Sequence, residues 1–169
     1  MTGLRRGGTR RKVQADVERD FEWGRLFLPH AKAICGGLLI GEATAEEDQQ
    51  HATDLMVLLL RDLRIAFRVR RHEFLHDYQD EFTIRSVRKS GIQTELAKIT
   101  AGWGDYFLYG FAAPDDRRLA AWTMVDLGAF RANQAQCPFV EKDNGDGTRF
   151  RAYPCSKMPA GIVIRKRRQ

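Results

Sequence analysis

Three residues in the first half of the chain have the types and spacing of a phosphodiester-cleaving site. Asp54 begins the apolar run at residues 53–60, where an unpaired carboxylate would be costly to bury. Glu81, Thr83 and Arg85 alternate along a second strand-like segment, so they share one face. Carboxylates can hold Mg²⁺, the metal can activate water, and a cation can stabilise the transition state. We therefore expect Asp54 and Glu81 as metal ligands, with the catalytic Arg85 beside the phosphate.

A second motif points to different chemistry. Residues 72–76 read His-Glu-Phe-Leu-His, which alone matches the HExxH zinc-protease motif, and Glu95 would be the third ligand. Its setting argues against this function, because Arg71 and Asp77 flank it and a helix here would cut into the strand predicted before it. We interpret the segment as a polar loop or short helix between two strands, and keep the zinc protease as a third alternative.

Positive charge exceeds negative charge, with 28 Lys and Arg against 22 Asp and Glu and a net charge of +6. A basic protein attracts polyanions, because binding releases counterions from their phosphates. Residues 64–71 place Ile65, Phe67 and Val69 on one strand face and arginines on the other. The cations expected to bind a nucleic-acid backbone, DNA rather than RNA, are Arg64, Arg68, Arg70, Arg88 and Lys89.

The elements that must position these residues follow from hydrophobic periodicity. Apolar spacing predicts a helix within residues 13–34, running up to Pro29. The expected strands are 53–60, 64–71, 81–86, 105–112, 119–126 and 161–164, with helices at 93–102 and 127–134 and a hairpin turn at 143–148. A hairpin at Arg61-Asp62 would join the first two strands. The result is an α/β fold with a mixed central sheet flanked by helices, an αβββαβ core and an appended C-terminal hairpin.

The chain of 169 residues, 43% of them hydrophobic, fits one domain. We expect that domain at residues 13–164, between a disordered basic tail at 1–12 and a basic tail at 165–169. Three widely spaced cysteines predict neither disulfides nor a thiolate zinc site. No apolar run reaches about 18 residues and the N-terminus lacks the apolar core of a secretory signal, so a cytoplasmic location is expected.

If the turn or short strand at residues 36–41 counts as the first strand-like element, Asp54 lies near the start of the second. This order, αβββαβ, resembles the PD-(D/E)XK, or restriction-endonuclease-like, nuclease superfamily. The segments EFTIRS, TELAKI and DYFLYGFA are also similar to those of phage- and prophage-encoded proteins of this fold. The resemblance covers roughly residues 15–130. It implies a nuclease that uses Mg²⁺, and a homodimer, because many nucleases of this class act as dimers.

The chain departs from the family pattern of an acid, one residue and then lysine. Glu81 is followed two places on by Thr83; alternatively Thr83 takes the place of the acid and Arg85 that of the lysine. Arginine replaces a proton-exchanging lysine poorly, because it stays charged. Glu95 and Lys98 would join the site from the next helix or form a surface ion pair. The sequence therefore predicts a nucleic-acid-binding protein and divalent-metal nuclease, or alternatively a non-catalytic DNA-binding or partner-binding accessory protein.

An aromatic block at residues 103–111 has two interpretations. Its alternating rings fit core packing of an apolar strand, which we favour for most of them. Trp103 stands between two glycines and is the exception, with stacking on exposed bases as its expected use.

Overall fold

The computed structural model describes residues 18–42, 55–57, 63–89 and 93–168. Residues 18–25 are helical, and after a turn at 26–27 the helix α2 (Leu28–Leu39) follows. The helix predicted to run up to Pro29 is therefore two helices. Pro29 is the second residue of α2, where its missing N–H costs no intrahelical hydrogen bond.

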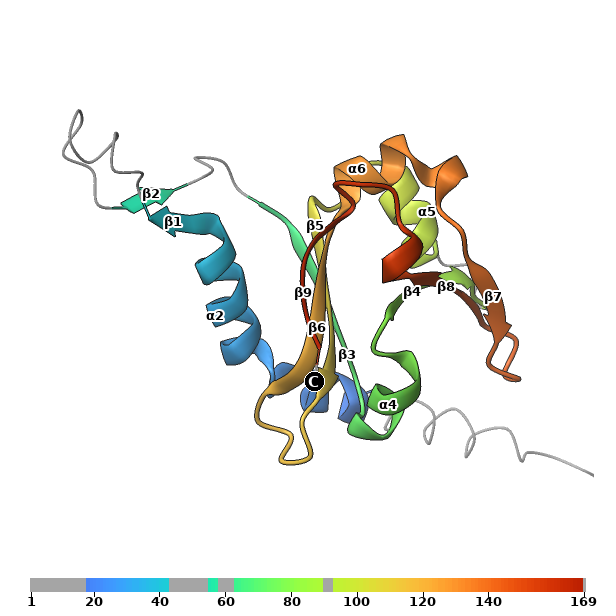
Figure 1. Ribbon diagram of the computed structural model, residues 1–169. Coiled ribbons are helices and arrows are strands. Elements are labelled where there is room, and N and C mark those ends of the chain that lie inside the picture. The colour runs from blue at the N-terminus through green and yellow to red at the C-terminus, as the bar shows by residue number, and fades with distance from the viewer. Residues whose placement is uncertain (1–17, 43–54, 58–62, 90–92, 169) are drawn as a thin grey trace, which may run out of the picture.

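A four-stranded mixed sheet forms the centre of the molecule (Figure 1). Its order is β3 (Ile65–Arg70), β5 (Tyr106–Ala112), β6 (Leu119–Asp126) and β9 (Val163–Arg167). β3 and β5 are parallel, and the other neighbours are antiparallel. β3 and β9 are thus the two edges of this sheet.

A second, antiparallel sheet has the order β4 (Glu81–Val87), β8 (Arg149–Pro154) and β7 (Val140–Asp143). Between β3 and β4 lie a 3₁₀ turn at His72–Phe74 and the single-turn helix α4 (Leu75–Tyr78). Helix α5 (Glu95–Thr100) leads from β4 into β5, and α6 (Leu127–Ala132) follows β6. The short strands β1 (Ile40–Glu42) and β2 (Leu55–Val57) pair with each other.

The central sheet is covered on both faces, so its core has two parts. On one face the rings of Phe82, Phe107, Phe130 and Tyr153 pack between the two sheets and the helix α6. Figure 1 shows α2 on the other face, where buried Ala31 meets residues of β5 and β6. This explains why β5 is nearly all apolar: both of its faces are buried.

The α/β class with a mixed sheet is confirmed, as are the strand segments at 64–71, 81–86, 105–112 and 119–126. Their predicted neighbours differ. In the described residues β2 pairs with β1 and β3 pairs with β5, while the hairpin turn expected at residues 61–62 lies outside the described residues. Alternating residues identify a strand, but they do not specify its partner.

The C-terminal part also differs from expectation. The hairpin β7–β8 is an integral part of the second sheet, because β8 pairs with β4 along its length. The predicted basic tail at 165–169 is in large part strand, since β9 extends to Arg167 and pairs with β6. In the described ranges, no helix has the length and apolar character needed to cross a membrane. The tail predicted at residues 1–12 lies outside those ranges.

Candidate anion site between the two sheets

Arg68 joins the two sheets through its guanidinium group. Strand alternation turns Phe67 toward the helical face, which leaves Arg68 on the face toward β4. There Arg68 Nη1 donates a hydrogen bond to the Thr83 carbonyl oxygen at 3.1 Å, and Nη2 forms an ion pair with Glu95 at 2.8 Å. The same Glu95 oxygen accepts a hydrogen bond from the backbone N–H of Arg85 at 2.9 Å. One carboxylate therefore holds β3, β4 and α5 together.

The position of Glu95 follows from local sequence. Thr94 caps α5, because its side chain accepts a hydrogen bond from the Ala97 N–H at 3.1 Å. Glu95 is then the first helical residue, and its carboxylate reaches Arg68. The sequence left two alternatives for Glu95, a place in the site or a surface ion pair with Lys98, and in the structure Glu95 pairs with Arg68.

Glu81 is also held by cations. The Lys142 Nζ atom donates to its carboxylate at 3.0 Å, and Arg70 Nη1 lies 3.9 Å away. The Arg70 guanidinium sits over the ring of Phe74, at 4.4 Å from its centre, and over that of Tyr78, at 5.0 Å. These contacts fix Arg70 at the end of β3.

A hollow of about 200 Å³ opens between β3 and β4. Its walls are Arg68, Arg70, Thr83, Arg85, Asn144 and Phe150. Arg85 is half-buried, and its guanidinium forms no hydrogen bond or ion pair with the part of the chain that the structure describes. Burial, followed by the charges of Arg68 and Arg88, lowers the pKa of Arg85, while Glu95 and Asp146 act in the opposite direction. Among the described residues that line the hollow, three are arginines and none is a carboxylate.

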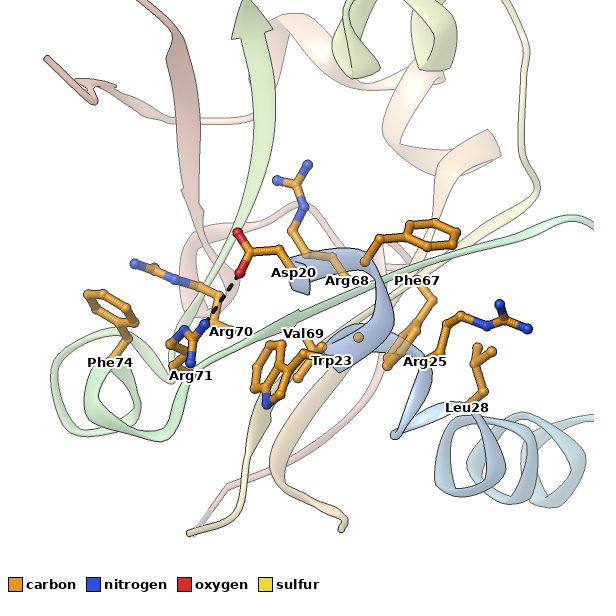
Figure 2. Close-up of a pocket in the computed structure, with 12 residues that line it drawn as sticks. Asp20, Trp23, Arg25, Leu28, Phe67, Arg68, Val69, Arg70, Arg71 and Phe74 are labelled. Carbon is orange, nitrogen blue, oxygen red and sulfur yellow. Dashed lines mark hydrogen bonds and ion pairs between the residues drawn. The ribbon is translucent and has the colours of Figure 1, made fainter. Parts of the chain in front are cut away.

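A larger cavity, of about 520 Å³, lies along the edge strand β3, and Figure 2 shows residues that line it. Arg68 and Arg70 line both spaces. The opposite wall is the helical segment 18–25, which is tied to the end of β3 by an ion pair between Asp20 and Arg71 at 3.3 Å. The Arg71 guanidinium also lies 5.0 Å from the ring centre of Trp23.

The structure brings together only some of the predicted site residues. Arg68, Arg70 and Arg85 converge on the hollow. Arg64 instead lies over the ring of Trp103, at 5.6 Å from its centre, and that tryptophan is 60% exposed as the sequence suggested. The remaining cations, Arg88 and Lys89, are exposed beyond the end of β4 and do not line the hollow.

Asp54, one of the two predicted Mg²⁺ ligands, lies outside the described ranges, so the Mg²⁺ site stays a prediction. The carboxylate of Glu81 already accepts a hydrogen bond from Lys142 and lies near Arg70, so two cations compete with any metal. Within these ranges no three His, Cys, Asp or Glu side chains lie where they could share a metal ion.

The zinc-protease arrangement is likewise not formed. His72 is in the 3₁₀ turn and His76 is in α4, so the motif does not lie on one continuous helix. The His72 Nδ1 atom lies 3.2 Å from the Ala112 carbonyl oxygen, whereas the His76 side chain is 97% exposed. Glu95, the expected third ligand, is paired with Arg68. The interpretation of the segment as a short helix between two strands is confirmed.

Sequence reasoning missed residues that come from distant segments. Asn144 and Phe150 reach the hollow because β8 pairs with β4. Phe21 and Trp23 line the larger cavity because the helical segment 18–25 packs beside β3. The turn signal at residues 143–148 located Asn144, but nothing in the sequence indicated which strand the hairpin would join.

Comparison with family models, with curated proteins and with solved structures finds no match to this chain.

Proposed function

We propose that this protein binds nucleic acid, and that the hollow between β3 and β4 holds a backbone phosphate. The observation that carries the proposal is the half-buried guanidinium of Arg85, which lacks an ion pair or hydrogen bond to the described part of the chain and stands among other arginines. A guanidinium in this setting is stabilised by an incoming anion. Its planar donor fork matches the oxygens of a phosphate.

The neighbouring contacts favour a phosphate over a small carboxylate. Arg68 is fixed by Glu95 and Thr83, so its charge is held beside the hollow at little further entropic cost. The Asn144 side chain adds an amide to the wall. The net charge of +6 supplies the longer-range attraction that a polyanion needs. One backbone phosphate of a nucleic acid would contact the fixed polar groups of the hollow, and the net positive charge would attract the remaining phosphates of the polymer.

The proposal is for binding without cleavage, which was the alternative from the sequence. Glu81 is engaged by Lys142 and Arg70, so we assign it a structural role at the edge of the hollow. DNA remains the expected polymer. The resemblance to PD-(D/E)XK nucleases stays a prediction, and cleavage by wild-type protein with Mg²⁺, lost on Asp54→Ala, would restore the catalytic interpretation.

The direct test is fluorescence anisotropy with a labelled DNA oligonucleotide at salt concentrations from about 50 to 200 mM. Arg85→Gln should weaken binding roughly tenfold and reduce the slope of log K against log salt by about 0.7 to 0.9. Arg165→Gln is the matched control, because Arg165 is exposed on β9 at the opposite edge of the sheet. Equal effects of the two substitutions, or no binding by wild type, would refute the proposed site.

A further inference from the structure

We propose that the larger cavity beside the hollow binds an unpaired base, so that the substrate class is single-stranded nucleic acid. This inference rests on the proposed function. It arises from the walls of the cavity, which combine aromatic rings with cations (Figure 2). At about 520 Å³ the cavity also lies within the usual range for ligand pockets, about 300 to 1,000 Å³.

Phe21 is the residue that the fold does not explain. It is 69% exposed, and in the described part of the chain its ring meets no other aromatic ring and no cation. The other rings of the cavity are occupied: Trp23 packs on Phe27 with ring centres 5.0 Å apart, and Phe74 is covered by Arg70. A large exposed apolar ring that lines a cavity is typical of a binding surface. An aromatic ring of this kind can stack on any base, because every base has a π-face.

Two residues line both the cavity and the hollow. Arg68 and Arg70 line both spaces, so a phosphate in the hollow places its own nucleotide next to the aromatic cavity. The connection runs along β3, which is an edge strand of the central sheet. A single strand can turn a base into the cavity while its phosphate stays with the arginines. A duplex must first unpair and unstack that base, which costs free energy.

The test compares three labelled DNA probes with the same backbone length: an oligothymidylate, an abasic oligomer and a hairpin duplex. Binding of the full chain is followed by fluorescence anisotropy at one salt concentration. We expect the oligothymidylate to bind about tenfold more tightly than the abasic oligomer and the duplex, since stacking on one ring contributes on that order. An oligouridylate run in parallel distinguishes RNA from DNA, and base dependence with either polymer supports the inference.

The variant Phe21→Ala should remove this preference and leave binding of the abasic oligomer unchanged. Phe21→Trp should retain the preference, because the indole also stacks. Leu26→Ala is the matched control: Leu26 is 57% exposed in the turn after the same helical segment, but it does not line the cavity. We expect its probe preferences to equal those of wild type. An equal loss in Leu26→Ala and Phe21→Ala would overturn the assignment of the base to this cavity.

The outcomes separate the two proposals. Equal binding of thymidylate, abasic and duplex probes, all weakened by Arg85→Gln, would overturn the inference while the phosphate site stands. Tighter binding of the duplex than of the single strand would also overturn it. Absence of binding to every probe would refute the proposed function itself.

Discussion

The two edges of the central sheet both carry arginines, but they hold them differently. On β3 the side chains of Arg68 and Arg70 are only 27% and 20% exposed, and Glu95 and Glu81 fix them from neighbouring elements. On β9 and directly after it, residues 164–168 are all exposed, and Asp80 forms ion pairs with Lys166 and Arg168. Carboxylates therefore hold cations at both edges. The edges differ in burial, because the paired arginines of β3 are less exposed than Arg168, whose side chain is 45% exposed.

The largest effect should come from removing the carboxylate that organises the β3 edge. Glu95→Ala leaves the Arg68 guanidinium and the Arg85 N–H without their shared acceptor, so we expect a loss of about 2 to 3 kcal/mol in the free energy of unfolding. Urea denaturation measures it. Asp77→Ala is the control, because its ion pair with His76 is largely exposed and should contribute less than about 1 kcal/mol. Equal losses in the two variants would show that the β3 network is no stronger than a surface pair.

A smaller effect is expected beneath the hollow, where Thr83 Oγ1 and the Tyr109 hydroxyl are 3.1 Å apart and buried. Burial is also the main reason why the pKa of Tyr109 is raised. Thr83→Val leaves that hydroxyl without this partner and should cost about 1 to 2 kcal/mol by urea denaturation. Adding Tyr109→Phe removes the second polar group and should recover part of the loss. A double variant less stable than Thr83→Val would contradict this account.

A pH-dependent effect on stability is expected from His30, whose pKa is influenced by Arg167 of β9. The Leu119 N–H donates to His30 Nδ1 at 2.8 Å, and burial, then the charges of Arg167 and Arg118, lower the pKa of His30. As pH falls from about 7 through 6.5, the unfolded chain takes up this proton before the folded protein does, so stability should fall. We expect a loss smaller than that of Thr83→Val. Urea denaturation of wild type and His30→Asn across this range checks it: the variant should lose this component, and an identical profile would exclude His30 as its source.

The smallest effect should follow from neutralising β9 itself. The double variant Arg165→Gln/Arg167→Gln should change the free energy of unfolding by less than about 0.5 kcal/mol, because both side chains are exposed. Removing Arg167 should also raise the pKa of His30, which NMR titration of the imidazole can follow. A loss as large as that of Glu95→Ala would abolish the contrast between the two edges.

Local patterns predicted the elements better than their partners. Alternation in residues 64–71 identified β3 and its arginine face, and the helix predicted at 93–102 contains α5, which carries Glu95. The division into two sheets could not be predicted, because β4 pairs with β8 across a long stretch of chain. The sequence placed Glu95 near the site as one alternative, but it did not indicate that Glu95 is the acceptor shared by Arg68 and the Arg85 N–H. Asp54, the predicted metal ligand, lies outside the described residues.

The pairing of β4 with β8 also determines when the hollow can exist. The strands join Glu81 to Pro154 and Val87 to Arg149, so the wall that contains Phe150 is made by residues near the end of the chain. Such long-range pairing forms late, because the loop-closure entropy must be paid before its contacts stabilise it. A chain still emerging from the ribosome therefore carries its arginines without the pocket that orders them. The hollow is therefore a property of the completed fold, and it cannot form before the residues of β8 have been synthesised.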